Sequence, residues 1–406
     1  MDKLVNNKTS TIKDMNESID KGREGEDFVQ FLAEKAYLKY WCFANPMDLD
    51  GDGKEICDLL ILFYDSAIII SVKNYNLNGN YDRFMNKVVG KSTKQLFGAQ
   101  RKFKQRGKIK LKHEIQGEVE FDTSSFENIF KITISVGEDF EHYDFVDYHD
   151  EKGIVNIFNR ETAGIIFDEL DTIKDLVEYL KARETLLQQN IKNVCHCSEK
   201  DLVAYFVTNA REFDPKLINN FSEESKTLKG RWENYIENRE VILKKLEDEN
   251  SYFIDRMVKT DILPLQDGEL LAKKFMTMSR FERRILANNL YDLVGKYENQ
   301  KDFLARRFTV FNGVAFLFVY YPIDRPRKEI DQMLLYAQQL YAYYKNADQI
   351  VLLAASNGLK QWKFGLFQST EINPAAEKYL KELSAQLGWF QNEKRSESII
   401  KEYKNS

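Results

Sequence analysis

The chain has 406 residues, which is too long for one ordinary domain and predicts two or three. Hydrophobic residues make up 43% of it, including 28 Phe and 21 Tyr, and this composition excludes a disordered chain. The formal net charge of −5 does not by itself indicate a nucleic-acid-binding protein, and 4 Cys are too few for a disulfide framework.

The N-terminal segment, residues 1–20, is predicted to be a polar tail. It lacks the apolar core of a signal peptide. No apolar run in the chain approaches the roughly 18 residues of a membrane span, and the longest lies around Ala315–Tyr321. We therefore expect a cytoplasmic protein that does not associate with membranes.

Residues 21–187 are expected to form an α/β domain in which strands and helices alternate. Phe28, Val29 and Leu32 recur at helical spacing, whereas later runs rich in Ile and Leu have the length of strands. The expected order is a helix at 21–40, a strand at Trp41–Ala44, strands at Asp58–Phe63 and Ala67–Lys73, a basic helix at Arg83–Arg106, a strand at Asn128–Val136, one or two strands in His142–Phe158, and a helix pair at Thr162–Leu187.

The second half of the chain is predicted in two parts. Residues 188–300 show charged helical faces and few strand signals, which predicts a helical region. Residues 301–406 are expected to form a small α/β domain around a βαβ-like unit, and this half is expected to bind a partner protein or a second copy of the chain. The expected elements are a strand or hairpin at Thr309–Tyr321, a helix at Glu329–Tyr344, strands at Gln349–Ala355 and Trp362–Phe367, and a closing helix at Pro374–Leu387.

The two runs 58–63 and 67–73 predict a β-hairpin that carries chemistry. With Asp65 and Ser66 as the turn residues, Asp58 lies opposite Lys73. Because side chains alternate between the faces of a strand, Asp58, Ser71 and Lys73 project from the same face at the open end of the hairpin. Cross-strand neighbours lie about 5 Å apart, so a carboxylate, a hydroxyl and an ammonium group meet there.

Phosphodiester hydrolysis needs such a set of groups. A carboxylate holds Mg²⁺ through hard oxygen ligands, and the metal polarises the scissile phosphate and lowers the pKa of its bound water. A nearby lysine orients that water or stabilises charge on the phosphoryl oxygens. The hairpin therefore offers part of the set that a metal-dependent phosphodiesterase needs, and a second carboxylate usually completes the metal shell.

Three short motifs give this part of the chain a family resemblance. They resemble the PD-(D/E)XK nuclease superfamily, and most of all its restriction-endonuclease-like and NERD-type members. The resemblance covers residues 21–112 and is expected to extend through the rest of the domain at 21–187. The motifs are Gly22-x-x-Gly25-Glu26, Glu55-Ile56-Cys57-Asp58 and Ser71-Val72-Lys73.

The resemblance implies a restriction-endonuclease-like αβββαβ fold and a division of labour among named residues. Glu26 and Asp58 would hold Mg²⁺ or Mn²⁺, and Lys73 would position the attacking water. Gln95, on the basic helix, would point at the site. The resemblance also implies a nuclease acting on DNA or RNA, and by analogy with nuclease effectors a role in bacterial defence against phage or plasmids.

Ser71 departs from the family pattern, which usually has Asp or Glu at this position. A serine hydroxyl is a weak metal ligand, so Ser71 is expected to serve as a minor ligand or a hydrogen-bond donor. Either Glu26 or Glu55 compensates by reaching the metal, or the fold is catalytically degenerate and binds nucleic acid or a partner protein without cleaving. A third alternative is that Asp58 and Lys73 form an ordinary cross-strand salt bridge.

A basic stripe follows the hairpin. Between Arg83 and Lys112 there are eleven Lys or Arg residues and no Asp or Glu. Such a local concentration of positive charge in an acidic protein favours a phosphate-binding surface over an ordinary solvated face, which usually mixes charges of both signs. The residues expected to contact nucleic acid are Arg83, Lys87, Lys91, Lys94, Arg101 and Lys102.

Two further motifs resemble metal sites, but neither has the ligands that such a site needs. The loop 48–53 imitates the start of an EF-hand, but its twelfth position is Leu59 where a bidentate Glu is needed. Cys195-His196-Cys197 places its cysteines too close together for a zinc knuckle, and no second pair follows. Both segments are therefore interpreted as ordinary surface or loop structure.

Overall fold

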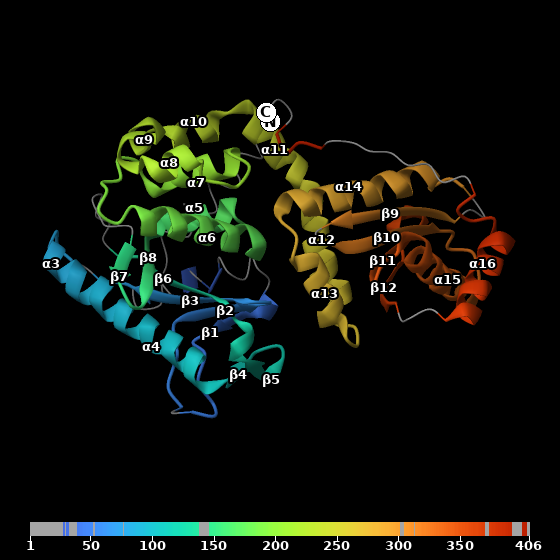
Figure 1. Ribbon diagram of the computed structural model, residues 1–406, viewed down its shortest axis with the longest axis horizontal. Helices are drawn as coiled ribbons and strands as arrows, with labels where there is room; N and C mark the ends of the chain where they lie inside the picture. The colour runs from blue at the N-terminus through green and yellow to red at the C-terminus, as the bar shows by residue number, and fades with distance from the viewer. Residues whose placement is uncertain are drawn as a thin grey trace. The chain divides into compact units, whose positions relative to one another are not determined.

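The computed structural model divides the chain into two units, Met1–Tyr235 and Ile236–Ser406. It describes residues 27, 28, 30, 31, 39–51, 53–75, 77–137, 146–300, 304–311, 313–369, 373–391 and 400–403. Each unit combines helices with a β-sheet, so the chain is mixed α/β as expected (Figure 1). The boundary falls inside the helical region expected at 188–300, and the helices of that region are shared between the two units.

The first unit is built on a six-stranded sheet of order β1-β2-β3-β6-β8-β7. Strands β1, β2 and β3 form an antiparallel meander, β6 and β8 run parallel to β3, and β7 is an antiparallel edge strand. Strands this rich in Ile and Leu suit a sheet that is covered on both faces. The strands are β1 (Cys42–Ala44), β2 (Leu59–Phe63), β3 (Ser66–Lys73), β6 (Asn128–Ser135), β7 (Val146–His149) and β8 (Gly153–Asn159).

Helices cover both faces of this sheet. Figure 1 shows the long basic helix below it, formed by α3 (Tyr81–Phe84), the π-helical turn η2 (Met85–Val89) and α4 (Gly90–Arg106). The helix pair α5 (Arg160–Glu169) and α6 (Ile173–Gln189) lies above it. The apolar side of α4 packs on the sheet through buried residues of both elements, among them Leu60, Ile69, Leu96, Ala99 and Phe103.

The register of the β2–β3 hairpin differs from the expected one by two residues. Phe63 pairs with Ser66, so the turn consists of Tyr64 and Asp65, and Asp58 lies opposite Ser71 and not opposite Lys73. The physical reason is that Tyr64 adopts a positive φ of 51°, which closes the turn one residue earlier. A shift of two residues leaves every side chain on its expected face, because the alternation also has a period of two.

A second hairpin lies within the stretch that the sequence analysis left without an element. Strands β4 (Lys108–His113) and β5 (Gly117–Asp122) pair antiparallel and form a separate two-stranded sheet. In β4 the apolar Ile109 and Leu111 are buried, whereas Lys108 and Lys112 are exposed. The basic stripe therefore continues from a helix into a half-buried strand.

Four short helices complete the first unit, and a buried ion pair joins them to the sheet layers. The Arg183 guanidinium on α6 donates to both carboxylate oxygens of Glu199, with Nε–Oε1 2.6 Å and Nη2–Oε2 2.8 Å. Tyr179 also donates to Glu199, and Arg183 donates to Asn156 on β8. The helices are α7 (Glu199–Thr208), α8 (Pro215–Asn219), α9 (Phe221–Leu228) and α10 (Arg231–Glu237).

The second unit contains the predicted βαβ unit. Strand β10 (Val314–Tyr321) leads through α15 (Arg327–Lys345) to the parallel strand β11 (Gln349–Ser356). The sheet order is β12-β11-β10-β9, with both edge strands antiparallel to their neighbours. The remaining elements are α11 (Arg239–Asp248), η4 (Glu249–Ser251), α12 (Tyr252–Met257), η5 (Val258–Ile262), α13 (Gly268–Met276), α14 (Arg280–Tyr297), β9 (Ala305–Phe311), η6 (Asn357–Leu359), β12 (Trp362–Gln368) and α16 (Pro374–Leu387).

Buried charges also hold the helices of the second unit together. Asp255 accepts hydrogen bonds from Arg280 at 2.7 Å and from Arg283 at 2.6 Å. Lys244 on α11 lies 3.4 Å from Glu402, so residues 400–403 pack against the helices of this unit. A buried charged side chain without a partner of opposite charge would strongly destabilise the fold, and these side chains have such partners.

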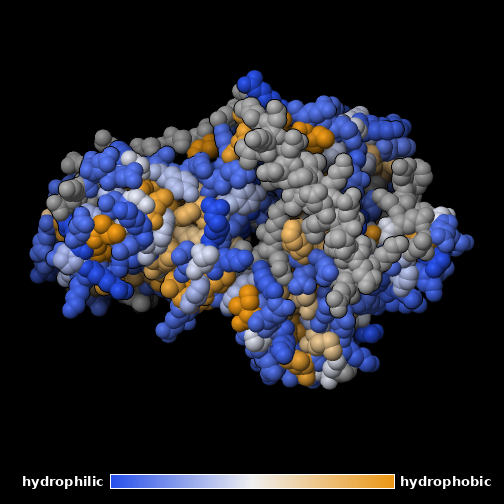
Figure 2. Space-filling model, turned by 180° about the vertical axis from the view of Figure 1, so that it is seen from behind, coloured by the Kyte–Doolittle hydropathy of each residue, from blue (hydrophilic) through white to orange (hydrophobic). Residues whose placement is uncertain are grey.

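The surface in Figure 2 is mainly hydrophilic and is interrupted by small groups of hydrophobic residues. Exposed apolar side chains such as Leu270 and Leu335 are of a kind that most folded proteins carry, and they need no special explanation. Among the helices that the structure describes, none is both long enough and apolar enough to cross a bilayer.

The Arg183–Glu199 pair gives a prediction about stability. Arg183→Met leaves the Glu199 carboxylate buried without its cation, so we expect the free energy of unfolding to fall by about 3–5 kcal/mol. Urea unfolding followed by circular dichroism measures this change. The exposed pair Glu223–Lys226 supplies the control, because Lys226→Met should leave the unfolding midpoint unchanged. An Arg183→Met protein as stable as the wild type would contradict the assignment.

Candidate functional site

Four polar side chains from three elements meet at the open end of the β2–β3 hairpin. Asp58 precedes β2, Ser71 and Lys73 end β3, and Gln95 faces them from α4. The three hairpin residues share the face of the sheet that α4 covers, as the alternation of side chains predicted. The structure therefore brings together four of the five residues proposed from sequence as catalytic, whereas Glu26 lies outside the described residues.

Asp58 is held by the neighbouring strand. Its backbone N–H donates to the Ile70 carbonyl at 3.1 Å, and its Oδ2 accepts the Val72 N–H at 2.5 Å. Its side chain is 14% exposed. No residue in the described part of the chain is hydrogen-bonded to Oδ1, so that oxygen remains available for a cation or a water molecule.

Gln95 is the acceptor that links the other two groups. Its Oε1 accepts a hydrogen bond from Ser71 Oγ at 3.0 Å and another from Lys73 Nζ at 3.1 Å. Ser71 is fully buried, and because its proton is directed at Gln95 its oxygen keeps lone pairs that can accept. The serine thus acts as a hydrogen-bond donor within the site, one of the two roles proposed for it.

Lys73 is fixed by three neighbouring oxygens. Its Nζ donates to the Val72 carbonyl at 3.1 Å and to Gln95 Oε1, and it lies 3.6 Å from Asp58 Oδ2. Its side chain is 14% exposed, so the ammonium group reaches solvent while its position is constrained. A positioned, partly desolvated cation is suited to neutralise charge on a phosphoryl oxygen.

The described residues provide only part of a metal site. Among them, no group of three or more His, Cys, Asp and Glu side chains is arranged to hold a metal ion. Burial and the charge of Asp58 raise the pKa of the Cys57 thiol, so this neighbour stays protonated and does not serve as a thiolate ligand. The Asp58 carboxylate fits Mg²⁺, which often takes one or two protein carboxylates together with water and substrate oxygens.

The basic stripe is divided by its ion pairs. Lys102 and Arg106 are both paired with the buried carboxylate of Asp48, and in the second hairpin Lys108 and Lys110 are paired with Glu120 and Glu118. Lys102 stays a predicted phosphate contact, and it shares the Asp48 carboxylate with Arg106. The residues expected to contact nucleic acid that remain exposed on the helix are Arg83, Lys87, Lys91, Lys94 and Arg101.

Two residues make contacts with the basic helix that the sequence analysis missed. Tyr75 follows Lys73 by two positions, and its hydroxyl accepts a hydrogen bond from Lys91 at 3.4 Å. Asp48 was recognised only as part of an imitation of a calcium loop, whereas in the structure it binds the C-terminal end of α4. No local signal predicts the second role, because Asp48 and Arg106 are far apart in the sequence.

The cysteine motif lies away from this site in the same unit. Cys195 Sγ and Cys197 Sγ are 3.6 Å apart, and both are free thiols. Cys197 is buried just before α7.

Comparisons with known proteins add no family assignment. No protein-family model matches the sequence, and no significant match is found among curated proteins or solved structures. The geometry of the site therefore carries the functional argument.

The double acceptor role of Gln95 gives a second prediction. Gln95→Leu removes the partner of the Ser71 hydroxyl and one partner of Lys73, so we expect the free energy of unfolding to fall by about 1–3 kcal/mol. Urea unfolding measures the change. Gln105→Leu is the matched control, because Gln105 lies on the same helix but is exposed. Equal unfolding midpoints for the two variants would refute the role of Gln95.

Proposed function

We propose that the first unit is a metal-dependent nuclease of the PD-(D/E)XK type that hydrolyses phosphodiester bonds in DNA, with RNA as the other candidate substrate. One observation carries the proposal: Asp58, Ser71, Lys73 and Gln95 converge at the end of one hairpin. These groups match the carboxylate, lysine and helix amide that the resemblance assigns to catalysis.

The topology of the sheet supports this proposal. In the six-stranded sheet, an antiparallel meander β1–β2–β3 is followed, after α4 and the separate β4–β5 hairpin, by β6, which is parallel to β3. This is the order βββαβ expected for a restriction-endonuclease-like domain after its first helix. Residues 27, 28, 30 and 31 are helical and lie before β1, where that first helix is expected.

The proposed chemistry assigns a task to each residue. Asp58, with Glu26 as the expected second carboxylate, would hold Mg²⁺ or Mn²⁺, which when bound supplies polarisation of the phosphate and activation of water. Lys73 stabilises negative charge on the phosphoryl oxygens, or orients the water. Gln95 holds the Lys73 ammonium in place, and Ser71 in turn stabilises the position of Gln95.

The exposed cations of the helix would bind the strand. Lys94 and Arg101 are seven residues apart, about two helical turns, and so lie on the same side of α4. Neither is in an ion pair with any described residue, in contrast to Lys102 and Arg106. Contacts to the phosphate backbone through such residues supply affinity but little sequence specificity.

A second candidate function is nucleic-acid binding without cleavage. Ser71 favours it, since this residue stands where a second carboxylate is usual and its hydroxyl is engaged by Gln95. The described part of the site then offers the metal one carboxylate, that of Asp58. Cleavage assays distinguish the two candidates.

The nuclease proposal predicts which variants lose activity. With supercoiled plasmid and single-stranded oligonucleotides as substrates, cleavage in Mg²⁺ or Mn²⁺ should stop in EDTA. Asp58→Asn and Lys73→Met should each reduce the rate at least about 100-fold, because the first loses the metal carboxylate and the second a group that stabilises transition-state charge.

Lys112→Met, an exposed change on β4, is the control and should cleave at the wild-type rate. Unchanged cleavage by both site variants would exclude this site as the catalytic centre. Binding by the wild-type protein without cleavage in either metal would support the second candidate function.

The exposed cations give a prediction about salt dependence. Replacing both Lys94 and Arg101 by Gln removes two phosphate contacts, so the slope of log Kobs for single-stranded DNA against log salt should become shallower by about 1.4. Fluorescence anisotropy in EDTA measures it. Lys108→Gln with Lys110→Gln is the matched control, because both lysines are already paired with glutamates. Equal slopes for the two double variants would show that the strand lies elsewhere.

A further inference from the structure

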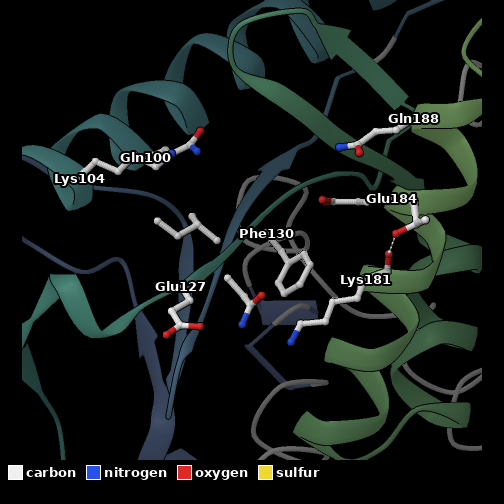
Figure 3. A pocket seen from close by; sticks show the side chains of 10 residues that line it. Gln100, Lys104, Glu127, Phe130, Lys181, Glu184 and Gln188 are labelled. Carbon is white, nitrogen blue, oxygen red and sulfur yellow. Dashed lines mark hydrogen bonds between the residues drawn. The ribbon is translucent and has the colours of Figure 1, made fainter.

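A polar hollow of about 480 Å³ lies on the first unit between α4, β6 and α6. Figure 3 shows Gln100 and Lys104 on one side of it and Lys181, Glu184 and Gln188 on the other. It involves none of the residues proposed above for catalysis. Its lining residues are Gln100, Lys104, Glu127, Asn128, Ile129, Phe130, Lys181, Glu184, Thr185 and Gln188.

The hollow exists because the sheet forks at this place. The pairing of β6 with β8 begins at Ile132 and Asn156. The Asn156 side-chain amide donates to the Lys131 carbonyl at 3.1 Å and to Glu184 Oε1 at 2.8 Å. It thus takes the place that β8 would occupy if it continued to pair with β6. The first half of β6, residues 128–131, therefore presents an edge toward the space between α4 and α6.

Charged groups of both signs surround this edge without neutralising one another. Lys104 and Lys181 contribute positive charge, and Glu127 and Glu184 contribute negative charge. Among the described residues, none of these four is in an ion pair within 4.0 Å, although most charged side chains of this unit's interior are paired. An occupant that carries both acceptors and donors would satisfy these groups together.

The buried Lys131 and the half-buried Glu184 lie beside the hollow in unfavourable surroundings. Burial raises the pKa of Glu184, although the hydrogen bond from Asn156 opposes this shift. Burial lowers the pKa of Lys131; the negative charge of Glu184 opposes this shift, and the charge of Lys104 adds to it. Donors placed against the Glu184 carboxylate, and an anion placed near the lysines, would therefore be bound more favourably than water.

The combination of groups restricts the chemistry of the ligand. A simple anion would be repelled by Glu127 and Glu184, and a metal ion would be repelled by Lys104 and Lys181. The buried Phe130 and the partly buried Ile129 add apolar surface for a flat group. An anionic group for the lysines, N–H donors for a carboxylate and a planar ring occur together in a nucleotide.

We propose that the hollow between α4, β6 and α6 binds a nucleoside monophosphate unit. The phosphate lies between Lys104 and Lys181, and the base donates to Glu184 and to the amide oxygens of Gln100 and Gln188. The unit is either a free nucleotide or the phosphorylated end of a strand. The site is separate from the proposed nuclease centre and does not depend on its activity.

Isothermal titration calorimetry in EDTA tests the proposal with the eight common ribo- and deoxyribonucleoside 5′-monophosphates. We expect saturable binding of at least one of them, at least about tenfold tighter than binding of its nucleoside or of inorganic phosphate. Lys104→Ala with Lys181→Ala, and separately Glu184→Gln, should each weaken it at least about tenfold. Lys112→Ala should bind as the wild type does, because Lys112 is exposed on β4 and does not line the hollow.

Glu184→Gln keeps an acceptor for Asn156, and thermal unfolding without ligand checks that each variant is folded. Gln188→Ala, at an exposed lining position, is a second probe that should weaken binding without affecting the fold. The proposal is overturned if no monophosphate binds, or if the lysine and glutamate variants bind as tightly as the wild type. Neither result bears on plasmid cleavage, so this proposal and the nuclease proposal fail independently.

A 5′-phosphorylated tetranucleotide distinguishes the two sources of the ligand. If the end of a strand occupies the hollow, the tetranucleotide binds more tightly than the monophosphate, and Lys94→Gln with Arg101→Gln weakens only the tetranucleotide. If a free nucleotide is the ligand, the tetranucleotide binds more weakly than the monophosphate, and that double variant does not change the binding of either. In both cases the Lys104 and Lys181 double substitution weakens binding.

Discussion

The hydrogen bond from the Val72 N–H to the Asp58 carboxylate holds together the end of the hairpin on which the candidate site depends. It joins the end of β3 to the residue before β2, and Asp58 lies opposite Ser71. With this register Ser71 and Lys73 both face α4, where Gln95 accepts from each of them. A slip of one residue would turn Asp58 away from this face and would expose the Ile and Leu side chains that now form the core.

The alternation of side chains along strands made most of this site predictable. Because side chains alternate between the two faces of a strand, the positions of Asp58, Ser71 and Lys73 in the sequence predict that they share one face. A register shift of two residues leaves this prediction unchanged. The error in register arose because Tyr64 adopts a left-handed conformation that its residue type does not suggest. Gln95 was proposed from the family resemblance, which implies a polar residue pointing at the site from the helix after the lysine strand.

Charge pairing was much less predictable from sequence. The uninterrupted run of Lys and Arg suggested one continuous surface, yet Asp48 neutralises its helical end and β5 supplies glutamates to its strand. Asp48 is distant in sequence from this run of Lys and Arg residues, and the glutamates belong to the β4–β5 hairpin, which the sequence analysis did not predict. The boundary between the units was hidden for the same reason, since Tyr235, the last residue of the first unit, is tied to Glu169 by a long-range hydrogen bond.

Helix α4 touches both the candidate nuclease site and the hollow. Gln95 and Lys104 stand nine residues apart on this one helix, a rise of about 13.5 Å. A helix packed on a sheet moves as a stiff rod, so a tilt or slide imposed at Lys104 is also felt at Gln95, and through it at Lys73. Coupling between two binding sites is reciprocal in free energy. If a ligand in the hollow binds one position of α4 more tightly, it therefore shifts the position of Lys73, and a ligand at Lys73 changes binding in the hollow by the same factor.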